Sequence, residues 1–358
     1  MKKLLVLADP NSMHTYRWVE SLKDDFCIYL IGFANSLERH YSSEIKVDII
    51  SVDESIRSSA KTIGKLKYLF SLLQFKTAYK AFDPDTVHSY YATSYGLIGA
   101  LLNPKNFHVS IWGSDIFDFP KRSIFHKSLF SWILFKADKI YGTSKMICNE
   151  VQLYSKREPI EIPFGIDTEL FSANKKQLSN PIRICCVKYF RDVYDIPTII
   201  SALYNVLQTH PTKDYHLHLV GDGPLKHDYI SLINELDLHK NVTIEGEIEN
   251  SKLPEFYKEM DIAVVASHRE SFGVSVLEAM ATLTPVFCSD IESFNEIADE
   301  NLVSYFPVKD VTALANLFLD FESNTPIYEE KAQKALKAVK INYSWEHSIS
   351  LQKQAYKD

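Results

Sequence analysis

The feature that most constrains the fold of this chain is a regular alternation of short apolar runs with longer stretches of helical periodicity. The longer stretches, such as residues 14–22 and 128–137, repeat apolar residues at the three- and four-residue spacing of a helix. Strands that alternate with helices are typical of a parallel sheet with crossover helices. In the first half, the strand-like runs are 3–8, 26–33, 47–52, 86–91, 108–112 and 139–144.

The same alternation starts again after the middle of the chain. The segment 163–181 between the two halves is polar and contains proline, which is typical of a linker. A chain of 358 residues is also longer than one hydrophobic core usually serves. We therefore predict an α/β protein with two Rossmann-like, doubly wound parallel-sheet domains, residues 1–165 and 166–340, and a terminal segment, residues 341–358. The strand-like runs of the second half are 182–190, 215–221, 241–247, 261–267 and 284–289.

Composition and charge exclude several classes of protein. A formal net charge of -7 gives no basic field, so nucleic acid is not an expected partner. The five cysteines lie inside apolar runs without CxxC spacing, which predicts reduced, buried packing residues of a cytosolic protein. The first apolar run meets Asp9 too early for a secretory signal, and the run 129–135 is far shorter than the ~18 to 20 residues of a spanning helix.

The segment 267–287, SHRESFGVSVLEAMATLTPVF, places two acids beside a helix that otherwise has a packing pattern. Glu270 lies in the loop that follows a predicted strand, and Glu278 lies about one turn into the helix that begins near Gly273. The first turn of a helix leaves backbone N–H groups that can bind a phosphate. The residues alone fit two interpretations, a nucleotide-sugar site or a core helix with carboxylates at its favoured end.

The same segment closely resembles the signature of the family 4 glycosyltransferases, an acid followed after seven residues by a second acid. These are retaining nucleotide-sugar enzymes of the GT-B fold, in which two Rossmann-like domains face a central cleft. Segments 9–22, 163–171 and 221–224 also resemble the family's first loop, hinge and nucleotide loop. Residues 343–356 are similar to its terminal helix, so the resemblance implies that 341–358 crosses back to the first domain.

The resemblance implies a role for each matching position of the donor site. Glu270 would contact the donor sugar, and Glu278 would bind the ribose. The other implied donor contacts are the backbone amides of Ser271, Phe272, Gly273 and Val274 and the loop glycines Gly221 and Gly223. The family also needs cationic side chains that stabilise the leaving diphosphate.

The cationic pair departs from the family pattern in this chain. Tyr189 and Tyr194 stand at the positions where many members have an arginine and a lysine. Lys188 lies one place earlier, as in a known variant of the motif, and Arg191 is close by. We expect Lys188 to be the catalytic cation that contacts the diphosphate, with Arg191 as the second candidate.

Four residues of the first half are candidates for contact with the acceptor and the reacting sugar. His88 matches a family position where a histidine follows a strand and faces the sugar, although such a histidine also fits a satisfied core residue. His14 and Arg17 follow the first strand, but DPNSMH replaces the family's usual Gly-Gly there. Asp115, in WGSD, fits either a hydroxyl ligand or a helix cap.

Motifs for other chemistries are incomplete. GDGP lacks the third glycine of a dinucleotide-binding fingerprint. The sequence DPD at 83–85 formally matches a metal-binding motif of the other glycosyltransferase fold, but Pro84 makes it a turn. We expect no metal and no cofactor.

Two acid-free stretches of the first half, 57–82 and 121–136, combine basic with aromatic residues. Such helices can lie on anionic lipid, and a solvated basic face fits the same pattern. The hypothesis is a cytoplasmic protein that is peripheral on the inner face of the membrane.

Together these features predict a retaining, metal-independent glycosyltransferase. It would move a hexose or N-acetylhexosamine from a nucleoside diphosphate sugar, UDP rather than GDP, to a hydroxyl of a glycan or lipid-linked glycan, in bacterial polysaccharide biosynthesis. The alternatives are a non-catalytic sugar-nucleotide or glycan-binding subunit and another GT-B enzyme, such as a nucleotide-sugar epimerase or a phosphorylase.

Overall fold

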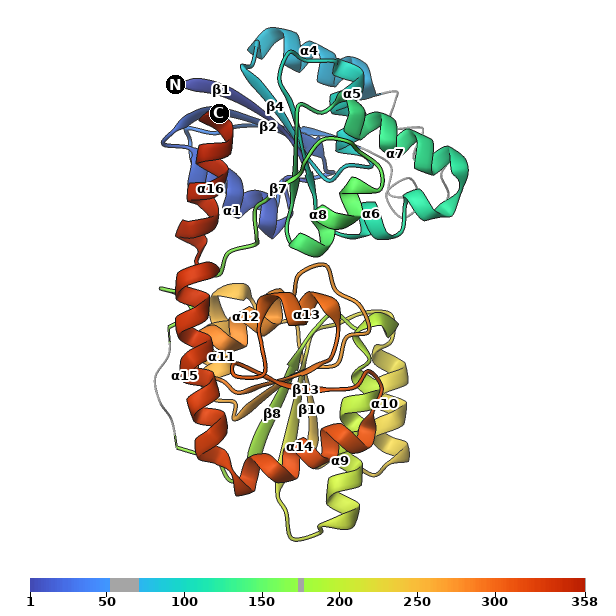
Figure 1. Ribbon diagram of the computed structural model, residues 1–358, viewed down its shortest axis with the longest axis vertical. Coiled ribbons are helices and arrows are strands. Elements are labelled where there is room, and N and C mark those ends of the chain that lie inside the picture. Colours follow the sequence, from blue (N-terminus) through green and yellow to red (C-terminus); the bar gives the residue numbers. More distant parts are fainter. Residues whose placement is uncertain (52–70, 173–176, 358) are drawn as a thin grey trace. The chain divides into compact units, whose positions relative to one another are not determined.

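The computed structural model describes residues 1–51, 71–172 and 177–357. The chain divides into two units, Met1–Pro163 together with Ile349–Asp358, and Phe164–Ser348. Each unit is a sheet flanked by helices (Figure 1). In both sheets the paired strands run parallel, which confirms the predicted α/β class and the two Rossmann-like sheets.

The first unit holds a seven-stranded sheet in the order β3-β2-β1-β4-β5-β6-β7. The order reverses between β1 and β4, so the connections after these two strands run in opposite directions at the carboxyl edge of the sheet. Its strands are β1 (Lys2–Leu7), β2 (Phe26–Phe33), β3 (Lys46–Ile50), β4 (Thr86–Tyr90), β5 (Phe107–Ile111), β6 (Lys139–Gly142) and β7 (Ile160–Glu161). Its helices are α1 (Met13–Leu22), α4 (Leu72–Phe82), α5 (Tyr95–Leu102), α6 (Ser114–Phe117), α7 (Ile124–Lys136) and α8 (Lys145–Gln152).

The second unit holds a six-stranded sheet in the order β10-β9-β8-β11-β12-β13, which reverses between β8 and β11. Its strands are β8 (Ile182–Val187), β9 (Tyr215–Val220), β10 (Val242–Gly246), β11 (Ile262–Val265), β12 (Val286–Ser289) and β13 (Ser304–Phe306). Its helices are α9 (Ile196–Thr209), α10 (Lys226–Glu235), α11 (Leu253–Lys258), α12 (Val274–Ala281), α13 (Glu292–Ile297), α14 (Val311–Ser323) and α15 (Thr325–Asn342). The last helix, α16 (Trp345–Lys357), begins in this unit and continues into the first.

The structure differs from the sequence prediction in several places. β7 and β13 were not expected, because runs of two and three residues are too short to give an alternating pattern. The run predicted as 182–190 ends as a strand at Val187, and the residues after it form a loop. The expectation that all cysteines are buried is wrong for Cys27, which is exposed on β2, and for Cys148 on α8, which is only partly buried.

The end of α16 is fixed to the first unit by a buried polar cluster. His88 is 0% exposed, and its Nδ1 and Nε2 lie 2.5 Å from the Tyr356 hydroxyl and 2.8 Å from the Ser110 hydroxyl. His88 lies inside β4 and does not follow it, so the expected placement after the strand is wrong. Because its ring is enclosed and both nitrogens have partners, His88 secures the terminal helix and offers no surface to a sugar.

A second histidine of this cluster makes the first unit sensitive to acid. Burial, and then the charge of Lys139, lower the pKa of His108 to about 3, so the ring is neutral in the folded protein. Its Nδ1 lies 2.8 Å from the Tyr141 hydroxyl and its Nε2 2.9 Å from Asn106 Oδ1. In the unfolded chain a histidine titrates near 6.5, so the unfolded state binds more protons below that pH.

We expect His108 alone to lower the free energy of unfolding by about 2 kcal/mol between pH 7 and pH 5. Urea unfolding of the wild type and of His108→Gln at both pH values measures this contribution. The wild type should lose about 2 kcal/mol more than the variant over this range, and an equal loss in the two proteins would contradict the neutral buried ring.

Candidate functional site

The candidate site lies at the carboxyl edge of the second sheet, where the strand order reverses between β8 and β11. Open parallel sheets bind ligands at this point because the two exit loops diverge over neighbouring strands. Here a backbone hydrogen bond joins the two loops: the N–H of His268 donates to the carbonyl of Val193 at 2.8 Å. The His268 Nε2 also lies 3.1 Å from the Asp195 carboxylate. The loop after β8 is therefore held against the loop after β11.

A buried ion pair between Lys188 and Glu270 is the main electrostatic feature of this edge. The Lys188 ammonium donates to the Glu270 carboxylate, and the two side chains are only 10% and 13% exposed. Burial alone would lower the pKa of Lys188, but the adjacent Glu270 carboxylate outweighs it and the pKa is raised. Lys188 therefore stays a cation inside a poorly solvated site.

Two neighbours fix the geometry of this ion pair. The Ser267 hydroxyl donates to Glu270 at 3.1 Å, and the ammonium of Lys188 lies 5.0 Å from the centre of the Tyr194 ring. Cation–π attraction and the charge-assisted hydrogen bonds hold both side chains in one arrangement. The ammonium has three N–H donors and uses one for Glu270 Oε1, so it can also bind an incoming oxyanion.

The glycines of the GDGP loop allow this arrangement by close packing. A Cβ at Gly221 would lie 2.1 Å from the Lys188 carbonyl oxygen, and one at Gly223 would lie 2.6 Å from the carbonyl oxygen of Phe190. Both glycines also have positive φ, at 135° and 155°. Only glycine lets the loop after β9 pass this closely under the backbone of Lys188.

Helix α12 starts beside the ion pair and presents a second carboxylate. Gly273 precedes it with φ 110°, and its carbonyl accepts the N–H of Val276 at 3.0 Å. The N–H groups of the first two helical residues, Val274 and Ser275, precede this bond, and such groups have no acceptor within a helix. Val274 and Glu278 are four residues apart and share one face of the helix. Glu278 is 7% exposed, so an acid is buried one turn from a helix start that favours anions.

Two further predicted donor residues lie in the loop between Glu270 and α12. Phe272 is buried, and its ring packs edge-on against Phe164 and Tyr343, with centroids at 6.2 and 5.9 Å. Ser271 immediately precedes it in the chain and is partly exposed. The phenyl ring anchors this loop, so the backbone amides around it have fixed directions.

Arg191 is not part of the buried arrangement. Its side chain is exposed, and its guanidinium stacks 4.9 Å from the centre of the Tyr189 ring. The structure thus brings together Lys188, Glu270 and the two loop glycines, and it places Arg191 on the surface of the same loop.

The acceptor-side candidates of the first unit lie after β1 and β5. His14, in the first turn of α1, has its ring edge-on to Trp112 at 5.8 Å, and burial, then Arg17, lower its pKa to about 4. Asp115 is fully buried and accepts three backbone N–H groups, from Ala92 at 2.9 Å, Gly113 at 2.8 Å and Trp112 at 3.2 Å. Asp115 joins the loops after β4 and β5 and is not exposed to a hydroxyl ligand.

Sequence reasoning missed Tyr257 of α11, a buried tyrosine whose pKa is raised well above its ordinary value by burial and then by the charge of Glu278. No motif marks this tyrosine, since it lies in a short helix before β11 and its interaction with Glu278 is made only by the fold.

Comparisons with known proteins identify the family and the fold of the chain. The family model described as "Glycosyl transferases group 1" matches residues 167–339, and the one described as "Glycosyl transferase 4-like" matches residues 3–144. An uncharacterized glycosyltransferase of Methanocaldococcus jannaschii, MJ1178, is 22% identical over 352 residues, which are 97% of this chain and 94% of that protein.

Solved structures give the same fold over the whole length. Sucrose-phosphate synthase from Thermosynechococcus elongatus superposes with a TM-score of 0.83 at 18% identity, covering 99% of this chain and 98% of that one. HepE from Anabaena, solved in complex with UDP, superposes with a TM-score of 0.77 at 16% identity, with 99% and 98% covered. Matched by family models in both of its units, the chain belongs to the group 1, family 4-like glycosyltransferases and has their GT-B fold.

Proposed function

We propose that this glycosyltransferase moves a hexose or N-acetylhexosamine from a nucleoside diphosphate sugar to a hydroxyl group, with retention of the anomeric configuration. The observation that carries the proposal is the buried Lys188–Glu270 ion pair beside the start of α12, one turn from Glu278. In such a donor, the diphosphate would lie between the Lys188 cation and the start of α12. The ribose would follow it and lie at the buried Glu278 carboxylate.

The proposed role of Lys188 follows from the charge that develops in the reaction. When the bond between the sugar and the diphosphate breaks, negative charge grows on the leaving oxygen. Lys188 is cationic and poorly solvated, so its attraction to that charge is stronger than it would be in water. The N–H groups at the start of α12 would add fixed dipoles.

The carboxylates have separate proposed roles. Glu270, paired with Lys188, would lie beside the sugar and stabilise the positive charge that grows at its anomeric carbon. Glu278 would accept hydrogen bonds from the ribose hydroxyls. Glu270 is already paired with Lys188, so it is not proposed as a covalent nucleophile. Front-face attack by the acceptor hydroxyl, without a metal, is the mechanism that we propose.

The proposal extends to the substrates. HepE, which shares the fold, was solved with UDP, and this supports UDP over GDP as the donor nucleotide. For the acceptor we propose a glycan or lipid-linked glycan of bacterial polysaccharide biosynthesis, made on the cytoplasmic side.

A thermal-shift screen of UDP-, GDP-, ADP- and CMP-sugars, followed by transfer assays, tests the proposal. A donor at 100 times its dissociation constant should add about 2.7 kcal/mol of stability. We expect a UDP-sugar to give the largest shift and then to be consumed with an acceptor. Tight binding without turnover would instead identify a non-catalytic subunit, and release of an epimer would identify an epimerase.

We also propose that the first unit contacts an anionic membrane surface through α7. In the part of the chain that the structure describes, every helix is too short or too polar to span a bilayer. The predicted basic segment 57–82 falls partly on residues 52–70, which lie outside the described residues. In α7, however, Ile124, Phe125 and Phe135 are 80%, 61% and 70% exposed. The cations around them are Lys121, Arg122, Lys127 and Lys136, and residues 121–136 contain no acid.

Sedimentation with vesicles that contain anionic phospholipid checks this surface. The double variant Ile124→Glu/Phe125→Glu should bind at least about tenfold more weakly than the wild type, because two apolar side chains no longer enter the lipid. The matched control is Ile341→Glu, since Ile341 is 71% exposed in the second unit. Equal binding by all three proteins, or no binding by the wild type, would contradict the proposal.

A further inference from the structure

The hydrogen bonds that fix the Glu270 side chain end on one of its carboxylate oxygens. The Lys188 ammonium and the Ser267 hydroxyl both donate to Oε1, the hydroxyl at 3.1 Å. An ionised carboxylate has about four acceptor sites, divided between its oxygens. Because both donors lie at Oε1, Oε2 is the oxygen that can meet a sugar.

The two donors to Oε1 differ in what else they can bind. Lys188 is the proposed contact of the leaving diphosphate, and an ammonium is a point charge on a flexible stem with rotatable donors. It would turn toward the diphosphate as negative charge grows there. Ser267 is 0% exposed, so neither a nucleotide sugar nor water reaches its hydroxyl. The bond from Ser267 therefore persists when the ammonium is shared with the diphosphate.

The backbone around Ser267 is held from both sides. The hydroxyl of Ser289, the last residue of β12, donates to the Ser267 carbonyl at 2.5 Å, and Ser289 is also 0% exposed. On the other side, the N–H of the next residue, His268, donates to the Val193 carbonyl in the loop after β8. The Ser267 hydroxyl thus approaches Glu270 from a fixed position.

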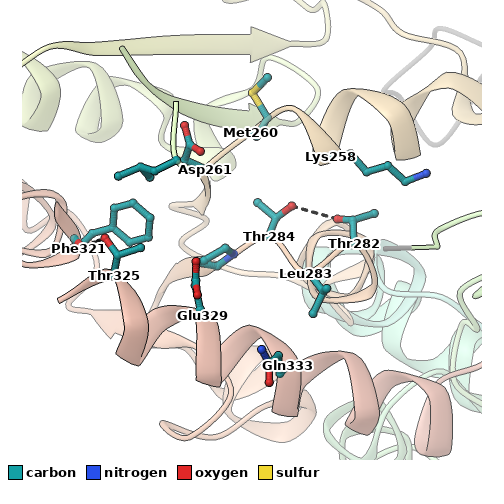
Figure 2. A pocket seen from close by; sticks show the side chains of 12 residues that line it. Lys258, Met260, Asp261, Thr282, Leu283, Thr284, Phe321, Thr325, Glu329 and Gln333 are labelled. Atoms are coloured by element: carbon teal, nitrogen blue, oxygen red, sulfur yellow. Dashed lines mark hydrogen bonds between the residues drawn. The ribbon is translucent and has the colours of Figure 1, made fainter. Parts of the chain in front are cut away.

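A pocket of the same unit lies at the opposite edge of the sheet and does not compete for the sugar. It lies where Asp261 and Pro285 precede β11 and β12, and Figure 2 shows Thr282 and Thr284 among its walls. Its volume is about 90 Å³, room for about three water molecules, so a hexose does not fit. The sugar of the proposed donor therefore belongs at the carboxyl edge, where Glu270 lies.

We infer that Ser267 is a positioning residue of the donor site, which keeps Glu270 Oε2 directed at the sugar while Lys188 turns to the diphosphate. The inference rests on the proposed function, in which Glu270 contacts the sugar and Lys188 the diphosphate. Ser289 supports this role by fixing the Ser267 backbone. Without the Ser267 hydroxyl, the carboxylate can follow the ammonium, and its negative charge then moves away from the anomeric carbon.

The test compares turnover with inhibition in Ser267→Ala. The kcat with a UDP-sugar should fall about tenfold, the effect of losing one hydrogen bond to a charged group. The inhibition constants of UDP and of inorganic diphosphate should stay within about twofold, because Ser267 contacts neither the nucleotide nor the diphosphate. An unchanged kcat, or UDP inhibition weakened as much as kcat, would overturn the inference.

The same change in the Glu270→Gln enzyme shows whether Ser267 acts through the carboxylate. Once the charge of Glu270 is removed, Ser267 has no charge left to position, so the two losses should not add. We expect Ser267→Ala to lower kcat less than about twofold in this background. A further tenfold loss would show a merely structural role and contradict the inference.

The matched control is Tyr215→Phe, which also removes one buried hydroxyl. Tyr215 is 0% exposed in the same unit, and its hydroxyl donates to the Phe318 carbonyl at 3.0 Å and to Glu322 at 3.1 Å. This variant should lose stability but keep kcat within about twofold. A loss of kcat equal to that of Ser267→Ala would mean that any lost buried hydrogen bond slows the enzyme, which contradicts a positioning role.

Two more variants keep the outcomes separate. Ser289→Ala removes the bond to the Ser267 carbonyl and should lower kcat about threefold with UDP inhibition unchanged, so the inference stays testable if Ser267→Ala does not fold. Glu270→Gln alone tests the proposed function. If Glu270→Gln keeps the wild-type kcat, the proposed role of Glu270 fails; if it loses turnover while Ser267→Ala and Ser289→Ala do not, only the role of Ser267 fails.

Discussion

Replacing Lys188 by alanine is expected to lower kcat about 100- to 1,000-fold, the usual effect of removing one fixed donor from a developing oxyanion. The side chain is buried beside the start of α12, so water cannot easily take its place. The dissociation constant for UDP should also rise about tenfold, because Lys188 would contact the diphosphate in the ground state as well.

Lys213→Ala is the matched control for this prediction. Lys213 also forms an ion pair with a glutamate of the second unit, at 2.8 Å from Glu322, but it is 32% exposed. Its loss should leave kcat within about twofold, since exposed ion pairs contribute little. Steady-state kinetics with a UDP-sugar compare the two variants. An unchanged kcat in Lys188→Ala would show that Lys188 has no role in the reaction.

Glu270→Gln is expected to separate turnover from binding. The variant should lose about 100-fold in kcat, because no negative charge remains beside the anomeric carbon. UDP should bind at least as tightly as in the wild type, since Lys188 is then no longer neutralised by its partner. Glutamine can still accept a hydrogen bond from the ammonium, which limits the loss of folding stability.

Kinetics and calorimetric titration with UDP measure the two effects of Glu270→Gln separately. The opposite pattern, unchanged kcat with weaker UDP binding, would assign Glu270 to the nucleotide and contradict its role at the sugar. Glu270→Ala should show the same split with a larger loss of stability, about 3 kcal/mol, because it leaves a buried cation unpaired.

The strand and helix alternation was sufficient to predict both parallel sheets, because buried parallel strands and crossover helices have different periodicities. It could not predict β13, since a three-residue strand has no pattern of its own and exists only by pairing with β12. The stop of β8 at Val187 was also missed, although this stop is what makes Lys188 a loop residue.

The candidate site also combines residues that the sequence predicts with contacts that only the fold creates. Spacing and resemblance pointed to Glu270 and Lys188, but only the pairing of β8 with β11 brings residues 82 positions apart into one ion pair. A polar residue near the end of a predicted strand can be exposed or buried, and the sequence does not show which. His88 and Asp115 have the right chemistry in the sequence, and the fold encloses both of them with partners of their own.

The measurement that tests the central claim most directly is ¹H NMR of the transfer reaction with the donor selected by the thermal-shift screen. We predict release of one nucleoside diphosphate for each sugar transferred, and a first-formed product whose anomeric proton shows the same configuration as the donor. The Lys188→Ala enzyme should form this product at least about 100-fold more slowly. An inverted product, or equal rates for the two enzymes, would contradict the account.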